Sequence, residues 1–204
     1  MTDNPQQTPS GLLFVLSGPS GAGKDAVMAR LREQRFPLRF GVTATTRRRR
    51  EGEVHGVDYF FVSDSEFDRM IGEDELLEWA VVHGNRYGVP RTQTRELLSA
   101  GIDVLLRVDV QGADSIRSRV SGSVLIFLTV PSLEALRIRL TKRNTETPQE
   151  LAVRLTNARE EMRRQEEFDY LVVNDDGGLD EAVEKVKAIV TAENCRVHRR
   201  QARV

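Results

Sequence analysis

One stretch of the chain has the residue types and spacing of a loop that binds a phosphate chain. Its residues are Gly18, Pro19, Ser20, Gly21, Ala22, Gly23, Lys24 and Asp25. Glycines let backbone N–H groups turn towards phosphate oxygens, and a lysine adds a mobile cation for the outer phosphates. An apolar run at residues 12–17 precedes the stretch, and a helix-period run at residues 24–34 follows it, which is the context of a P-loop. We therefore predict a site for the phosphates of a nucleoside triphosphate.

The last position of this motif departs from its usual form. Asp25 stands where a P-loop normally offers a Ser or Thr hydroxyl to Mg²⁺. A carboxylate is a good ligand for a hard cation, but it also places a negative charge beside the phosphates. Two interpretations stay open at this point. Asp25 approaches Mg²⁺ directly or through one water, or it turns away and caps the N-terminus of the helix.

A second group of charged and aromatic residues lies in segment 43–62. An unbroken run of arginine occupies residues 47–50, and Tyr59 follows after glycines at 52 and 56. Guanidinium groups bind the oxygens of a phosphate monoester in a bidentate manner, so the run is suited to a nucleotide phosphate. Taken alone, it is equally typical of a solvated loop or of a patch that binds nucleic acid.

Segment 43–62 resembles the guanylate kinase family. The family pattern reads S-x-T-T-R-x-x-R-x-G-E-x-x-G-x-D-Y-x-F, and the segment matches it with Thr43 in place of serine. The resemblance continues through residues 84–88, 108–112 and 173–175 and covers nearly all of the chain beyond residue 11. It implies transfer of the γ-phosphate of ATP, accompanied by Mg²⁺, to GMP. A catalytically weak protein-interaction module of the same fold is the alternative. Lys24 of the P-loop and the arginines Arg139, Arg143 and Arg154 argue against it.

The resemblance also implies roles for individual residues. GMP would be bound by Thr43, Arg47, Arg50, Tyr59, Glu78, Tyr87 and Asp109. ATP would be bound by the eight P-loop residues together with Arg139 and Arg143. The catalytic residues would be Lys24, Arg47, Arg139 and Arg154, and the metal would lie near Asp25 and Asp109. The carboxylate of Glu78 would accept from the N1–H and the exocyclic amine of guanine, a pair of donors that adenine lacks.

Two positions depart from the family pattern in the acceptor region. Val89 stands where many members have a Ser or Thr near the base. Arg107 replaces the first aspartate of a frequent Asp-x-Asp strand, which leaves Asp109 as the acid at the end of this strand. We expect Asp109 near the metal and the acceptor, and the sequence assigns no role to Arg107.

The elements that must position these residues follow an α/β pattern. Apolar runs alternate with helix-period segments at residues 12–17, 24–34, 104–109, 111–119, 124–130, 133–143, 170–173 and 179–193. Near-continuous apolar strands predict a parallel sheet that helices cover on both faces, as in a P-loop core.

Two insertions in this core are predicted. Strand candidates at 58–62 and 79–82 around a helix at 65–71 indicate a β-rich, GMP-binding insertion at residues 43–91. A capping box at residues 147–150 opens a helix that we expect to extend to about residue 167. With the preceding helix it would form a lid at residues 132–161. We expect one domain, with its core at residues 11–42, 92–131 and 162–204.

Composition sets few further limits. The 204 residues carry a formal net charge of −1 and a single cysteine, Cys195. No apolar run approaches the length of about 18 residues that a membrane span needs. We expect a cytoplasmic protein without nucleic-acid or membrane partners, and the sequence does not indicate an oligomeric state. The basic end at residues 196–203 is interpreted as a solvated helix end, with contact to an acidic partner or RNA as the alternative.

Overall fold

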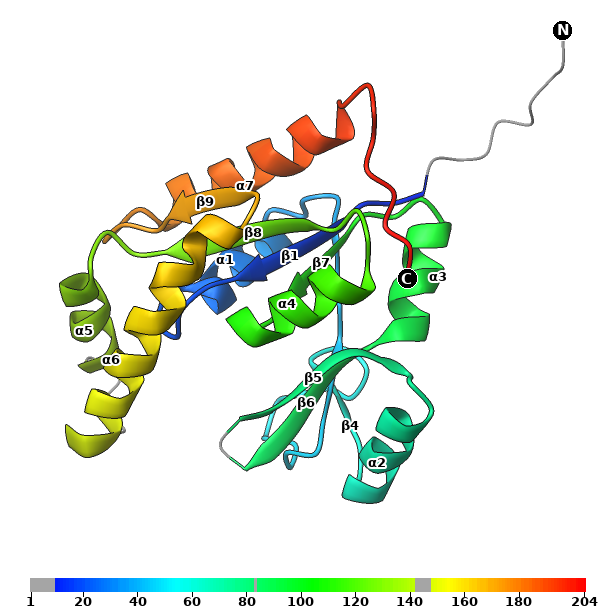
Figure 1. The fold of residues 1–204 in the computed structure, drawn as a ribbon, viewed down its shortest axis with the longest axis horizontal. Coiled ribbons are helices and arrows are strands. Elements are labelled where there is room, and N and C mark those ends of the chain that lie inside the picture. Colours follow the sequence, from blue (N-terminus) through cyan, green and yellow to red (C-terminus); the bar gives the residue numbers. More distant parts are fainter. Residues whose placement is uncertain (1–9, 83, 142–147) are drawn as a thin grey trace, which may run out of the picture.

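The structure is a computed structural model that describes residues 10–82, 84–141 and 148–204, without the side chains of residues 148–151. Two β-sheets lie one above the other in Figure 1. The larger sheet contains, in spatial order, β2 (Arg39–Phe40), β7 (Val104–Arg107), β1 (Leu13–Ser17), β8 (Val124–Thr129) and β9 (Tyr170–Val173). The smaller sheet contains β4 (Tyr59–Phe61), β3 (Thr43–Thr45), β6 (Asn85–Pro90) and β5 (Leu76–Val82).

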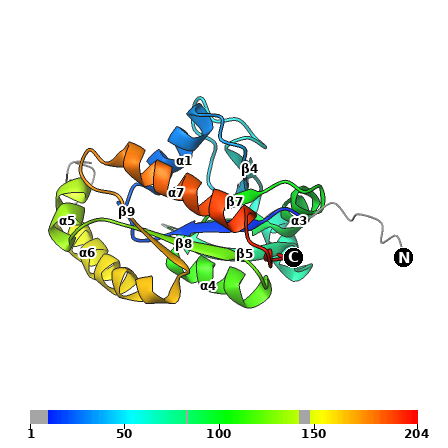
Figure 2. The same cartoon turned by 90° about the horizontal axis from the view of Figure 1, so that it is seen from above.

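The larger sheet is parallel throughout, as the apolar strands predict. Its two faces are both covered, and Figure 2 shows helices on either side. The helices of the core are α1 (Lys24–Glu33), α3 (Arg91–Ser99), α4 (Val110–Arg119) and α7 (Leu179–Asn194). Side chains alternate along β1, so that Phe14 packs towards α1 and α7, whereas Val15 packs towards α3 and α4. The central strand is therefore buried on both faces.

The smaller sheet is mixed. Strand β3 pairs with β4 in parallel and with β6 in antiparallel orientation, and β5 completes a hairpin with β6. Helix α2 (Asp64–Gly72) covers one face, where Phe67 and Met70 pack against Ala44 and Leu76. The Ser63 hydroxyl accepts from the backbone N–H of Glu66 and so caps this helix.

A pair of helices flanks the other side of the core. Helices α5 (Leu133–Thr141) and α6 (Pro148–Arg163) pack against each other through an apolar cluster that includes Leu136, Leu140 and Ala158. The expected long helix is shorter than predicted, because the chain tightens into the 3₁₀ turn η1 (Arg164–Glu167) after Arg163. The predicted cap Thr147 lies outside the described residues.

Several short elements were not predicted from the sequence. Strands β2, β3 and β6 and helix α3 have no counterpart in the predicted pattern, and β5 begins three positions before the predicted strand at residue 79. Strand β2 is only two residues long, Arg39 and Phe40. Strand β6 contains Gly88 and Pro90, and glycine and proline are both unfavourable in strands. These strands are held by pairing with neighbours rather than by their own periodicity.

The basic C-terminal end does not continue the last helix as expected. Helix α7 ends at Asn194, and the following segment runs back beside the core to the end of the chain near α3 (Figure 1). Arg200 pairs with Asp169 at 3.0 Å, and Arg199 lies 3.4 Å from Asp103. These arginines are thus engaged by acids of the same chain. None of the described helices is both long and apolar enough to cross a membrane.

Candidate functional site

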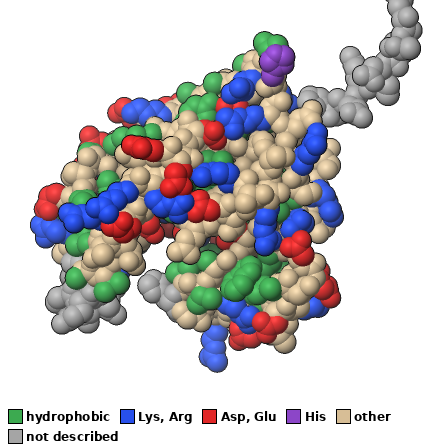
Figure 3. Space-filling view, viewed as in Figure 1, with side chains coloured by type: hydrophobic (Ala, Val, Ile, Leu, Met, Phe, Trp, Pro, Cys, Tyr) green, Lys and Arg blue, Asp and Glu red, His purple; other side chains and the backbone are tan. Residues whose placement is uncertain are grey.

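A cleft of about 590 Å³ opens between the P-loop, the smaller sheet and α6. Its wall includes Lys24 and Asp25 from the larger sheet's side, Tyr59 and Glu78 from the smaller sheet, and Glu161 from α6. Figure 3 shows the surface hollowed between the two sides. The P-loop and segment 43–62, the two binding regions predicted from the sequence, therefore both contribute residues to this cleft.

The P-loop has the conformation that its glycines predict. Gly18 has a φ of 134°, and a Cβ atom there would lie 2.0 Å from the carbonyl oxygen of Leu128. Gly23 has a φ of 99°, and a Cβ atom there would lie 2.4 Å from Nδ2 of Asn174. Both positions thus require glycine for conformation and for space. The Asn174 amide also donates to the carbonyl of Ala22 at 2.8 Å, which fixes the loop from behind.

Lys24 folds back over this loop. Its Nζ donates to the carbonyl oxygens of Gly18 and, at 3.2 Å, of Pro19. Burial lowers the pKa of Lys24 to about 8, although the nearby carboxylate of Glu161 opposes the shift. A phosphate chain that enters the cleft would supply negative charge next to this ammonium group and would stabilise its protonated form.

Helix α6 contacts the P-loop through one face. The guanidinium of Arg154 donates to Oγ of Ser20 at 2.6 Å, and Glu161 accepts from the backbone N–H of Ser20 at 3.4 Å. Asn157 lies on the same face and also lines the cleft. Burial raises the pKa of Glu161, and the Lys24 charge counteracts that rise. Arg154 was predicted from the sequence, whereas Asn157 and Glu161 were not, although their spacing of three and four residues places all three on one helix face.

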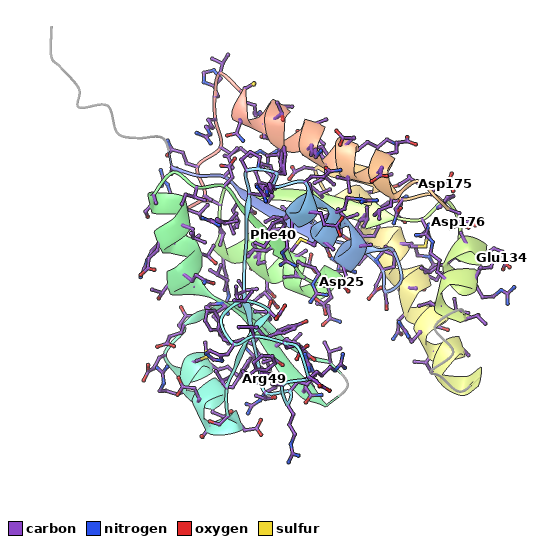
Figure 4. The ribbon with its side chains drawn as sticks, turned by 180° about the vertical axis from the view of Figure 1, so that it is seen from behind. Asp25, Phe40, Arg49, Glu134, Asp175 and Asp176 are labelled. Atoms are coloured by element: carbon purple, nitrogen blue, oxygen red, sulfur yellow. The ribbon has the colours of Figure 1, made fainter. Side chains whose placement is uncertain are left out.

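Arg139 lies in a separate pocket of about 310 Å³ beside the P-loop. Its guanidinium donates to the carbonyl of Asn174 at 2.8 Å and pairs with Asp176 at 3.0 Å. Figure 4 shows Asp175 and Asp176 at this end of the molecule, next to α5. Arg139 is therefore not among the described residues that line the larger cleft. Arg143 lies outside the described residues.

The predicted acceptor residues come together only in part. The ring of Tyr59 lies 6.1 Å from that of Tyr87, and the Arg47 guanidinium lies 5.2 Å from the Tyr59 ring centre. Arg47 is paired with Glu53 at 2.6 Å, which raises its pKa. Arg50 is exposed. Neither arginine appears among the described residues that line the cleft, whereas both tyrosines and Thr43 do.

Glu78 is a buried carboxyl group at the floor of the cleft, with 7% of its surface exposed. Burial, and secondly the charge of Asp109, raise its pKa to about 8. Asp109 itself caps α4, because its Oδ1 accepts from the backbone N–H of Gly112 at 2.7 Å. A Cβ atom at Gly112 would lie 3.0 Å from Oε2 of Glu78, so glycine leaves room for this carboxyl group. Val89 is buried in the core at 2% exposure rather than lining the cleft.

Asp25 does not adopt the second of the two arrangements expected from the sequence, in which it would turn away and cap α1. Gly23 is the N-cap of α1 and no side chain caps this helix, so Asp25 does not serve as the cap. Its Oδ1 instead forms an ion pair with Nη1 of Arg107. Figure 4 shows Asp25 on the side of the core that faces the smaller sheet. Nη2 of Arg107 donates to the Tyr59 hydroxyl at 3.2 Å, so the residue without a predicted role joins the two sides of the cleft.

The donor set is compatible with Mg²⁺ that arrives with a nucleotide. Mg²⁺ usually takes one or two carboxylates, several waters and substrate phosphates rather than a complete protein cage. Asp25 and Asp109 both line the cleft. Within the described residues there is no group of three or more His, Cys, Asp or Glu side chains that could hold a metal.

A P-loop between a parallel strand and a helix, with its lysine lining the cleft, defines a nucleotide-binding protein of the P-loop class. The sequence model of the guanylate kinase family matches residues 10–193. The chain therefore belongs to the guanylate kinase family, whose members are nucleoside monophosphate kinases.

Individual relatives agree with this assignment. The chain is 48% identical over 197 residues to guanylate kinase 2, chloroplastic/mitochondrial, of Oryza sativa, covering 96% of this chain and 69% of that one. It is 47% identical over 189 residues to a guanylate kinase of Caldanaerobacter subterraneus, covering 93% and 91%. The crystal structure of guanylate kinase from Anaplasma phagocytophilum superposes with a TM-score of 0.72 at 33% identity, covering 94% and 90%. The interaction-module alternative is not favoured.

Proposed function

We propose that this chain transfers the γ-phosphoryl group of ATP, bound with Mg²⁺, to GMP and releases ADP and GDP. The observation that carries the proposal is the shared cleft, in which the P-loop lysine and the buried Glu78 line one cavity. With the triphosphate of ATP on the P-loop and the guanine of GMP at Glu78, the γ-phosphate of ATP and the phosphate of GMP would face each other. Such positioning supplies much of the rate in phosphoryl transfer.

The reaction needs no general base from the protein. An oxygen of the GMP phosphate attacks the γ-phosphorus, the bond to the β,γ-bridging oxygen breaks, and ADP leaves with the electron pair. Lys24 and Arg154 would balance the charge that moves between the two nucleotides. Mg²⁺ would be held by the phosphates with Asp109 and Asp25 as the nearby carboxylates, and it would neutralise charge on the ATP phosphates.

The division into core, acceptor insertion and lid is part of this proposal. Helices α5 and α6 have an apolar cluster of their own, distinct from the clusters of the core, which supports movement as a unit. Closure over the cleft would exclude water, which would otherwise accept the phosphoryl group. In the lid, Arg139 and Arg143 would act from α5 and its C-terminal side, and Arg154 from α6.

A coupled assay tests this function directly. ADP formation from ATP is measured with GMP, AMP or UMP as acceptor, and nucleotide products are identified by chromatography. The proposal requires GDP as the product and a clear preference for GMP. Equal rates with AMP, or ADP formation that does not depend on any acceptor, would contradict it. We also propose a cytoplasmic location, consistent with the free Cys195, and cell fractionation would test it.

A further inference from the structure

Three described residues form a chain of polar contacts across the cleft. Asp25 belongs to the P-loop side, Arg107 ends strand β7, and Tyr59 begins strand β4 of the smaller sheet. The Arg107 guanidinium contacts both other residues, through Nη1 to the Asp25 carboxylate and through Nη2 to the Tyr59 hydroxyl at 3.2 Å. This contact chain involves Asp25, which departs from the usual form of a P-loop, and Arg107, which departs from the family pattern.

The register of the larger sheet places Arg107 beside the P-loop. Arg107 is paired with Leu16 of β1, one residue before the end of that strand, and the P-loop follows directly. The carboxyl ends of parallel strands are where such sheets bind ligands. Arg107 lies close enough to Lys24 for its charge to lower the pKa of that ammonium group. Its side chain is 31% exposed, so one part of the guanidinium faces the cleft.

The two contacts of Arg107 differ in what they provide. Asp25 supplies a formal negative charge that orients the guanidinium and offsets the cost of burying it. Tyr59 supplies a neutral hydroxyl, which can bind a phosphate oxygen at the same time as a guanidinium does. The guanidinium therefore lies in the cleft between the P-loop side and the smaller sheet.

We propose that Arg107 binds the phosphate of the acceptor nucleotide beside Tyr59, and that Asp25 is the positioning residue that holds Arg107 there. This inference rests on the proposed function, because it assigns a residue to the acceptor half of the same site. In this arrangement the P-loop acid serves the acceptor side of the cleft. If Asp25 alone is replaced by a neutral residue, the positive charge of Arg107 remains at the site, but its guanidinium is no longer held in this orientation.

The test is a double-variant cycle read by calorimetric binding of GMP and of guanosine, without ATP and without divalent metal. Arg107→Ala is expected to weaken GMP binding about ten- to a hundredfold, because it loses a charge-assisted contact to phosphate. Guanosine has no phosphate, and its affinity should stay within about twofold of the parent. Arg107→Lys keeps the charge without the planar fork and should fall between Arg107→Ala and the parent.

Asp25→Asn tests the positioning role. It is expected to weaken GMP binding about three- to tenfold, and to have no further effect when Arg107 is already alanine. Full additivity of the two changes would overturn the role of Asp25. Arg30→Ala serves as the matched control, because Arg30 pairs with Glu33 and Asp180 and is not among the described lining residues.

The remaining outcomes separate this inference from the proposed function. Equal loss of GMP and guanosine binding in Arg107→Ala would show a purely structural role and overturn the inference. The same holds if Arg107→Ala fails to fold and the folded Arg107→Lys variant binds GMP as the parent does. If the parent converts GMP to GDP but the affinity for GMP does not change when Arg107 is replaced, this inference alone is overturned. A parent that binds no GMP would overturn both.

Discussion

The P-loop side and the smaller-sheet side of the cleft are built in different ways. On the P-loop side, backbone groups make the site, and Asn174 and the glycines hold them in a single conformation. On the smaller sheet, long side chains make the site, and Arg47 is paired with Glu53 while Arg50 is exposed. One half of the site is therefore preassembled, whereas the arginines of the other half would have to move towards a bound phosphate.

The largest effect is expected on the preassembled side. Lys24→Met should lower kcat/KM about 10²–10³-fold, because it removes the P-loop cation that would balance charge on the transferred phosphate. Its far-ultraviolet circular dichroism should match the parent, since the hydrogen bonds of Lys24 within the described residues go to carbonyls of its own loop. Steady-state kinetics with ATP and GMP measure the effect. A loss below about fivefold would show that the loop acts without its lysine.

A smaller and more selective effect is expected on the acceptor side. Arg47→Ala, and to a similar degree Arg50→Ala, should raise the KM for GMP about ten- to a hundredfold and leave the KM for ATP within about twofold. Arg48→Ala is the matched control, because Arg48 is an exposed arginine of the same run to which no phosphate contact is assigned. Equal changes in both KM values would refute the assignment of these arginines to the acceptor.

The same difference between the two sides explains which parts of the site could be predicted from the sequence. The P-loop was predictable because glycine conformation, strand and helix are local properties, and the motif specifies all of them. The pairing of Asp25 with Arg107 was not, since 82 residues separate them and only the sheet register brings β7 beside the P-loop. Strand β6 was missed because its pairing with β3 and β5, rather than its own residues, stabilises it.

If guanine binds at Glu78 as proposed, its binding should depend on pH, because this carboxyl group is buried. Its pKa of about 8 means that the group is mostly protonated near neutral pH, whereas acceptance from two guanine donors requires the carboxylate. Guanosine affinity should therefore rise with pH by up to about tenfold per unit between roughly pH 6 and 7.5. Calorimetry in buffers of different ionisation enthalpy should show release of a proton. Affinity independent of pH would mean that the base is read without the ionised carboxylate. Glu78→Gln should abolish the dependence and weaken discrimination against AMP.

The smallest effect is expected on stability, where Glu78 and Lys24 should differ in their dependence on pH. The pKa of Glu78 is raised from 4.5 to about 8, so between these values the unfolded chain loses a proton that the folded protein keeps. Folding stability contributed by this group therefore falls as pH rises, by at most about 1.4 kcal/mol per pH unit. Glu78→Gln carries no such proton, and its Tm should rise relative to the parent by about 2–5 °C per unit between roughly pH 5 and 8.

Lys24 behaves differently over the same range. Its pKa is lowered from 10.5 to about 8, so below about pH 8 both the folded and the unfolded chain hold the proton. The penalty for burying this charge is then constant, and it decreases only as pH rises from about 8 towards 10.5. The Tm difference between Lys24→Met and the parent should therefore stay level between about pH 5 and 7.5, while that of Glu78→Gln slopes upward. Both differences are measured in a Glu161→Gln background, because the Lys24 charge lowers the pKa of Glu161 and its loss would otherwise change the titration of that carboxyl group. Parallel slopes for the two variants would show that burial affects the two sides of the cleft in the same way, and level lines for both would remove Glu78 as the titrating group.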